Sequence, residues 1–171
     1  MSAHFLGDVK TIWLRDPDDD RNMELIEDFV FVDQSNKQWK SAKGSIINGA
    51  SIPPAFWTVI GPPFVGNYRR ASVVHDTACK EMTEPSDEVH LMFFDAMIAD
   101  GTGTIKAHAM YQAVKQFGPS WDVNNPVAFT AAAEPTEKQA RSLLEAVANA
   151  TKEAGENATP QEVEKLTKFT R

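Results

Sequence analysis

Apolar residues three and four positions apart predict two consecutive amphipathic helices in the middle of the chain. The first covers 71–82, and its apolar face also carries His75 and Cys79; the second covers 85–100, with His90 on its apolar face. Side chains at this spacing share one face of a helix. We therefore expect both histidines to point inward. If the chain reverses near residue 82, they lie level with each other between two antiparallel helices.

Weaker patterns predict the elements on either side of this hairpin. Proline before and glycine after 55–60 favour a short helix there, and helical spacing continues over 105–117 up to Gly118. His108, between two alanines on this third helix, is expected to be exposed. The segment 121–133, with its Asn-Asn-Pro sequence, is expected to be irregular.

The first third of the chain has the composition of strands. Partly alternating, β-branched and aromatic residues predict strands over 9–14, 23–32 and 39–47, joined as an antiparallel meander or hairpin layer. The fold class is therefore α+β: a small N-terminal antiparallel β layer, a helical core built on an antiparallel helix hairpin, and a C-terminal helical tail.

The last part of the chain predicts two further helices. Helical spacing runs through 140–148, and Thr159 and Glu162 form a capping box around Pro160. These helices have too few apolar residues to form a core alone. We therefore expect the tail to dock on the domain, to pair with another copy or to stay mobile. The expected division is a domain over 1–121, a linker over 122–134 and an amphipathic helical tail over 135–171.

Composition excludes several classes of protein. No apolar run approaches the ~20 residues of a membrane-spanning helix, and the N-terminus lacks the basic and apolar regions of a signal peptide. The single cysteine excludes an internal disulfide framework. We expect synthesis in the cytoplasm and no transmembrane segment.

The net charge of −7 comes almost entirely from residues 8–33, which hold nine acidic and three basic side chains. The absence of a basic stripe argues against nucleic-acid binding. The run Asp16-Pro17-Asp18-Asp19-Asp20 lacks the spacing and closing glutamate of a calcium loop, so a solvated turn is expected there.

A divalent metal is one candidate role for the helix hairpin. His75 and Cys79 lie four apart, a spacing that lets an imidazole and a thiolate bind one zinc ion. His90 could supply a third ligand, and Asp76 or Asn48 a fourth contact. The alternative is that Cys79 is a small buried apolar residue.

General-base catalysis is the other candidate role. His75 could take a proton from water or a nucleophile, with Asp76 and His90 supporting it or holding a metal. His90 could equally set the tautomer of His75, and either histidine could be a structural core residue. The tight turn over 49–54 could present its backbone or Ser51 to the pocket, although Ser51 is not in a nucleophile elbow. The expected pocket residues are Asn48, Ser51, Trp57 and Tyr68.

A string of motifs over residues 8–121 resembles the family known as domain of unknown function 1353, common in phages and prophages. The motifs are Ala50-Ser51-Ile52-Pro53 with Trp57, Gly66-Asn67-Tyr68, Ala71 through His75-Asp76, Phe93 through Met97, Met110-Tyr111-Gln112-Ala113-Val114 and Phe117-Gly118-Pro119-Ser120-Trp121. Many members carry aspartates at the positions of Asn48 and His90. The resemblance therefore implies a site whose chemistry has changed in this chain.

The layout is more loosely similar to secreted and viral phospholipases A2. Those enzymes place a His-Asp pair on one helix opposite a helix with an orienting aspartate. The similarity implies that His75 is the base, that Asp76 binds calcium, and that His90 stands at the position of the orienting acid.

Two functions of different classes follow. One is a small phage- or prophage-type hydrolase acting on an envelope component, either a lipid ester or a cell-wall bond, through a pocket centred on His75 and Asp76. The alternative is a non-catalytic virion or accessory protein, with a structural histidine cluster and 135–171 as an assembly surface for virion proteins or a second copy. A third hypothesis is a toxin-like effector delivered by a tail-derived machine.

Overall fold

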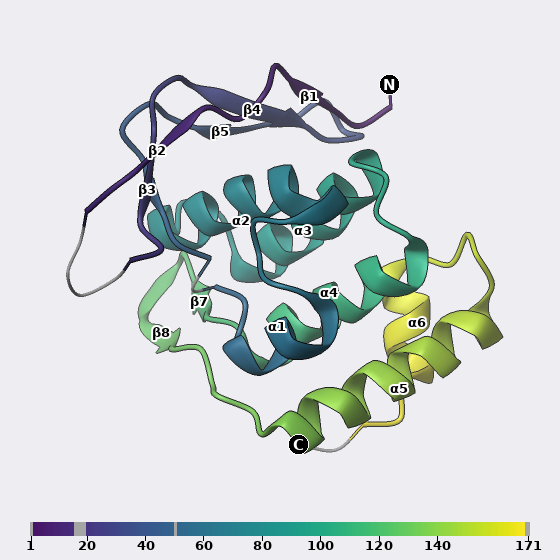
Figure 1. The fold of residues 1–171 in the computed structure, drawn as a ribbon. Helices are drawn as coiled ribbons and strands as arrows, with labels where there is room; N and C mark the ends of the chain where they lie inside the picture. The colour runs from purple at the N-terminus through teal and green to yellow at the C-terminus, as the bar shows by residue number, and fades with distance from the viewer. Residues whose placement is uncertain (1, 16–19, 50, 170–171) are drawn as a thin grey trace.

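The computed structural model describes residues 2–15, 20–49 and 51–169, and it has the expected α+β architecture. The N-terminal strands form a layer on one side of the helices, and the C-terminal helices lie at the far side (Figure 1). The expected turn in the Asp-rich run falls largely on residues 16–19, which lie outside the described residues. None of the described helices is both long and apolar enough to cross a bilayer.

The β layer consists of two antiparallel three-stranded sheets. One has the order β1 (His4–Leu6), β4 (Phe29–Val32) and β5 (Gln38–Ser41); the other has the order β2 (Thr11–Trp13), β3 (Met23–Leu25) and β6 (Ile46–Ile47).

The expected strands over 23–32 and 39–47 are each broken in two, and their halves belong to different sheets. The break after β3 falls at exposed residues, where Ile26 N–H bonds to the Lys10 carbonyl (3.0 Å). The Asp28 carboxylate accepts from the Lys43 N–H (2.8 Å) across the second break. A side chain thus replaces a ladder bond, which ends the pairing and lets the chain pass to the other sheet.

The helical core follows the sequence pattern closely. Its helices are α1 (Pro54–Ile60), η1 (Gly66–Tyr68), α2 (Arg69–Glu81), α3 (Ser86–Ala99) and α4 (Thr104–Phe117). Met82 adopts a left-handed conformation (φ 51°) that ends α2 and reverses the chain, so that α3 packs along α2. The hairpin predicted from the spacing of apolar residues is therefore present.

The segment after α4 is more regular than expected. β7 (Ser120–Asp122) pairs antiparallel with β8 (Asn125–Thr130). The Asp122 carboxylate accepts from the Asn124 N–H (2.8 Å), which closes the turn between the strands. The expectation of an irregular segment was wrong because the Asn-Asn turn signal belongs to a hairpin.

The C-terminal region docks on the rest of the chain, which is one of its three expected fates. α5 (Glu137–Ala154) packs against α4 and α1, and α6 (Pro160–Leu166) packs against α5 and α4 (Figure 1). The apolar side chains of both helices enter the common core, and they include Ala140, Leu143, Val147, Ala150 and Val163.

This docking also corrects the expectation for His108. Because α5 and α6 cover α4, the His108 side chain is fully buried, and its ring lies 4.6 Å from that of Phe94.

Candidate functional site

The α2–α3 hairpin brings His75 and His90 together in the core. Their side chains are 0% and 2% exposed, and His75 Nε2 lies 3.0 Å from His90 Nδ1. The ring of Phe93, one turn along α3 from His90, stacks on the His75 ring at 4.3 Å. The two imidazoles thus face each other, as predicted, in a buried environment, and we call this pair the imidazole cluster.

A hydrogen-bonded chain extends from both ends of this pair. Ser51 Oγ lies 3.2 Å from His75 Nδ1, and His90 Nε2 lies 3.1 Å from the Pro119 carbonyl oxygen. A carbonyl only accepts, so His90 carries its proton on Nε2. His90 Nδ1 then accepts from His75 Nε2–H, which leaves His75 Nδ1 to accept from the Ser51 hydroxyl.

Burial keeps both imidazoles neutral. Desolvation lowers the pKa of His90 to about 4, although its bond to the Pro119 carbonyl acts in the opposite direction. The pKa of His75 is lowered well below its usual value by complete burial and by the neighbouring His90. Near pH 7 both rings are therefore uncharged, as the chain from Ser51 to Pro119 requires.

The Pro119 carbonyl, which ends the hydrogen-bonded chain, lies in a segment that is held by contacts with the start of α3. The Trp121 indole donates to the Glu84 carbonyl (2.7 Å), and the Ser86 hydroxyl bonds to both the backbone oxygen (3.0 Å) and the backbone N–H (3.2 Å) of Trp121. Pro119, two residues earlier, is fixed by this attachment. No sequence signal could have identified it, because its contribution is a backbone atom.

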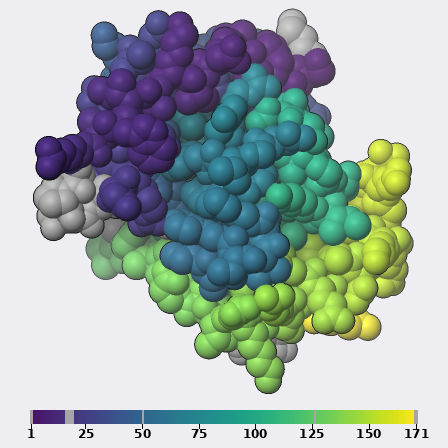
Figure 2. Space-filling view, viewed as in Figure 1, coloured from purple at the N-terminus to yellow at the C-terminus, as the bar shows by residue number. Residues whose placement is uncertain are grey.

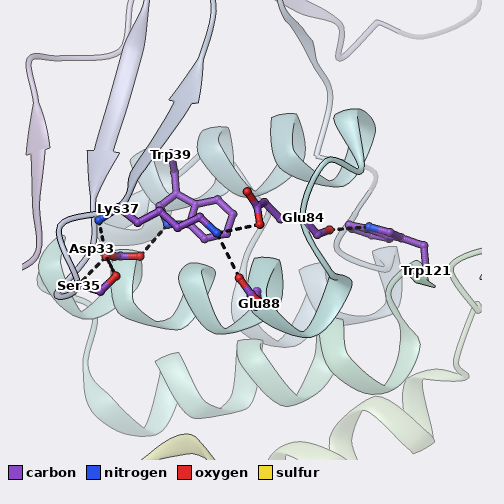
Figure 3. A network of polar contacts seen from close by, with 7 residues as sticks. All are labelled: Asp33, Ser35, Lys37, Trp39, Glu84, Glu88 and Trp121. Carbon is purple, nitrogen blue, oxygen red and sulfur yellow. Dashed lines mark hydrogen bonds and ion pairs between the residues drawn. The ribbon is translucent and has the colours of Figure 1, made fainter. Parts of the chain in front are cut away.

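The same helix end is tied to the β layer (Figure 3). Lys37 Nζ binds the Glu84 and Glu88 carboxylates at 2.9 and 3.1 Å, and it lies 4.3 Å from the centre of the Trp39 ring. The Trp39 indole donates to Asp33 (3.0 Å). The network therefore joins the β4–β5 turn, the start of α3 and β7.

Cys79 lies beside the imidazole pair. Its Sγ is 3.6 Å from His75 Nε2 and 3.9 Å from His75 Nδ1, and its side chain is buried. Burial raises the pKa of the Cys79 thiol far above its usual range. Without a bound cation the sulfur is therefore protonated, and it is no nucleophile.

The donor atoms also fit a zinc ion. One donor each from His75, Cys79 and His90 lies within 4.8 Å of the other two. Tetrahedral zinc separates two nitrogens by about 3.3 Å and a nitrogen from a sulfur by about 3.5 Å. The corresponding separations here are 3.0 Å and 3.6 Å. The expected zinc ligands are thus brought together, and a cation would stabilise the thiolate form of Cys79.

Asp76 occupies a different position from the one expected. It is the next residue to His75, so it is turned by about 100° around α2. Its Oδ2 accepts from the backbone N–H of Asn48 (2.9 Å) and Gly49 (3.3 Å) and binds Lys80 Nζ (3.2 Å). The carboxylate therefore holds the turn that precedes Ser51, and the structure does not bring it to the imidazole cluster.

The turn itself explains how Ser51 reaches α2. Gly49 has φ 73°, and a Cβ at this position would overlap the Pro63 ring, so only glycine fits. Ile52 N–H bonds to the Gly49 carbonyl (3.2 Å), and the Ile52 carbonyl accepts from the Trp57 indole (2.9 Å). The Ser51 hydroxyl is thereby fixed on His75.

The four expected pocket residues separate into two groups. Asn48 and Trp57 line a cavity of about 440 Å³, but Ser51 does not lie on its wall. Tyr68 is buried, and its hydroxyl donates to the Pro62 carbonyl (2.9 Å).

Comparison with known proteins identifies the family. Residues 23–114 match the family described as "Protein of unknown function (DUF1353)". Two relatives are uncharacterized proteins of Sinorhizobium fredii (strain NBRC 101917 / NGR234). Protein y4jT is 40% identical over 113 residues, which cover 66% of this chain and 34% of y4jT. Protein y4iH is 37% identical over 105 residues, which cover 61% of this chain and 44% of y4iH.

The chain thus spans less than half of the length of these curated relatives. No solved structure matches it significantly. The family match covers more than half of the chain and includes Ser51, His75, Cys79 and His90. The protein belongs to the DUF1353 family.

Proposed function

We propose that the protein is a hydrolase of acyl bonds in an envelope component, either a lipid ester or a cell-wall bond, and that it serves a phage or prophage. In this proposal Ser51 is the nucleophile, His75 is the general base, and His90 is a positioning residue. The observation that carries the proposal is the continuous chain from Ser51 Oγ through both imidazoles to the Pro119 carbonyl.

The reaction follows from the proton positions. Ser51 Oγ attacks the acyl carbon while its proton passes to His75 Nδ1; the resulting imidazolium keeps its Nε2–H bond to His90. The tetrahedral intermediate then collapses, and the Nδ1 proton goes to the leaving alcohol or amine. Water then attacks the acyl-enzyme, again with His75 as the base. Collapse of the second tetrahedral intermediate releases the acid and returns the proton to Ser51.

Access to the hydroxyl requires movement. Ser51 is 6% exposed and His75 is fully buried. The segment that runs from Ser51 into α2 fills the middle of the face in Figure 2, between the N-terminal strands and the C-terminal helices. Substrate therefore reaches Ser51 only when part of the structure that covers it moves outward.

A fluorophosphonate probe tests the proposal, because it forms a covalent bond only with an activated serine. We expect mass spectrometry of the intact chain and its peptides to find the label on Ser51. The label should be absent from Ser51→Ala, reduced by about 10²–10⁴ in His75→Gln, and unchanged in Ser35→Ala, a control on an exposed turn.

A matched pair at the second histidine gives a finer test. In His90→Asn the side-chain amide oxygen stands in for Nδ1 and can accept from His75, whereas His90→Leu has no acceptor. We expect the asparagine variant to retain more labelling than the leucine variant. A folded wild-type protein whose Ser51 stays unlabelled would overturn the proposal.

A second candidate function rests on the metal-like spacing of His75, Cys79 and His90 and on their burial. In this alternative the cluster holds a structural zinc in a non-catalytic virion or accessory protein. Elemental analysis after purification without chelators should then find about one zinc per chain, and Cys79→Ala should lose it; a content below about 0.2 equivalents would exclude this function. The hydrolase proposal instead requires that Cys79→Ala keep the label on Ser51.

A further inference from the structure

The cavity beside the Ser51 turn has an unusual wall. It measures about 440 Å³ and lies between the first strands and the segment that leads into α2. Three aromatic side chains and two arginines contribute to it, namely Trp13, Trp57, Phe64, Arg21 and Arg69. A volume of this size accepts a small molecule.

The charge of the wall is opposite to that of the whole protein. The chain carries 24 acidic and 17 basic side chains. The described residues that line the cavity nevertheless include both arginines and no carboxylate. The cavity thus favours an anion in a molecule that otherwise repels anions.

The two arginines of the cavity have different surroundings. The Arg21 guanidinium lies 4.8 Å from the centre of the Trp57 ring, so the pair forms a flat cationic and aromatic wall. The Arg69 side chain is exposed and forms no ion pair with a described residue. Asp8 and Asp100, which line another pocket together with Arg69, bind the neighbouring Arg70, at 4.0 and 2.6 Å.

The cavity adjoins the turn that carries the proposed nucleophile. Asn48 on its wall stands three residues before Ser51, and the Trp57 indole bonds to the carbonyl of Ile52, the residue after Ser51. A ligand in the cavity therefore contacts residues that hold the turn on both sides of Ser51.

We propose that this cavity binds the anionic group of the substrate, a carboxylate or a phosphate, with an adjoining apolar or aromatic portion packed against Trp13 and Trp57. This inference deepens the proposed function and rests on it for the role of Ser51. The substrate class is then an acyl compound with an anionic group near the scissile bond. The shared chemistry is that of a soluble organic anion or an anionic lipid headgroup.

Two fluorescent probes of similar shape test the binding directly. Anilinonaphthalene sulfonate carries a negative charge, and phenylnaphthylamine is its neutral counterpart. We expect the sulfonate to bind the wild-type protein at least about five-fold more tightly than the neutral probe, since only the sulfonate forms a charge-assisted contact with a guanidinium group. Arg69→Gln and Arg21→Gln should each remove most of this preference.

Three variants serve as controls. Arg141→Gln removes an equal charge from the exposed side of α5, and Ile105→Ser alters a separate apolar groove between α1, α4 and α5. Neither should change sulfonate binding. Ser51→Ala should also bind the probe normally, so failure of the catalytic proposal remains distinguishable from failure of this one. Equal affinity for both probes, or equal losses in Arg69→Gln and Arg141→Gln, would overturn the inference.

The source of the anion is decided by two further measurements. Displacement of the sulfonate by naphthyl phosphate but not by naphthol identifies a soluble anion. Binding to phosphatidylglycerol vesicles but not to phosphatidylcholine vesicles, with loss in Arg69→Gln, identifies a lipid headgroup. Either result supports the anion site, and the absence of both overturns it.

Discussion

The cluster around His75 and the cavity lined by Arg21 and Arg69 lie on two sides of the same turn, yet their physical environments are opposite. The cluster is sealed, with neutral side chains linked by short hydrogen bonds. The cavity is open, and its wall carries permanent positive charge on aromatic supports. Under the two proposals, this difference suits two tasks: proton transfer from Ser51 to His75 benefits from exclusion of water, whereas binding of an anion requires a cavity that is open to solvent.

The largest loss of stability is expected from a substitution at Asp76, where the two regions are joined. Asp76→Ala removes the buried carboxylate that accepts from the backbone N–H groups of Asn48 and Gly49. We expect a loss of about 3 kcal/mol in the free energy of unfolding, measured by urea denaturation. Probe binding in the cavity should weaken as well, because the turn forms part of its wall.

Glu153→Ala is the matched control for this change, since it removes an exposed carboxylate from α5. Its effect should stay within ±0.5 kcal/mol. If Asp76→Ala is equally mild, the carboxylate does not hold the turn, and the link between cluster and cavity fails.

A fall in pH should affect the two regions differently, with a somewhat smaller change in stability than that expected for Asp76→Ala. The pKa of His90 falls to about 4 in the folded protein, against about 6.5 in the unfolded chain. The unfolded state therefore binds more protons, so the stability from the neutral pair is complete above about pH 6.5 and declines as the pH falls toward 4. His90 alone should account for a loss of about 2 kcal/mol near pH 5, and this part of the loss should be absent in His90→Asn.

Asp95 changes the stability in the opposite direction as the pH falls, so its contribution must be removed from this comparison. Burial, with a contribution from Asp33, raises the pKa of Asp95 to about 6, so its protonation favours the folded state as the pH falls through that value. The titration is therefore best measured in Asp95→Asn. The arginines keep their charge over this range, and probe binding should persist as long as the protein is folded. A stability that is flat from pH 7 to 5 in Asp95→Asn would contradict the neutral-pair assignment.

The smallest change in stability is expected from a substitution in the cavity itself. Arg69 is exposed and forms no ion pair with a described residue, so Arg69→Gln should change the free energy of unfolding by less than about 0.5 kcal/mol. The same variant should lose most of the sulfonate preference. A large destabilisation would mean that Arg69 supports the fold, and the contrast between a structural cluster and a binding cavity would then be lost.

The sequence predicted the helices well because each carries its own pattern. Periodic apolar positions placed His75, Cys79 and His90 on the inner faces of α2 and α3, and the capping box at Thr159 marked the start of α6. The strands were predicted less well. Met23 to Val32 has one continuous apolar pattern, but side-chain bonds at Asp28 divide it between two sheets.

By itself, the sequence determined the fold class, the helix hairpin and the inward side of the histidines, because these depend on neighbours three and four residues away. Only the tertiary structure decided which residues meet. It directed Asp76 toward the turn, brought Ser51 onto His75 and supplied the Pro119 carbonyl to His90. These contacts join residues 24 to 29 positions apart in the sequence, and their geometry depends on how the turn, α2, α3 and β7 pack, which no local pattern encodes.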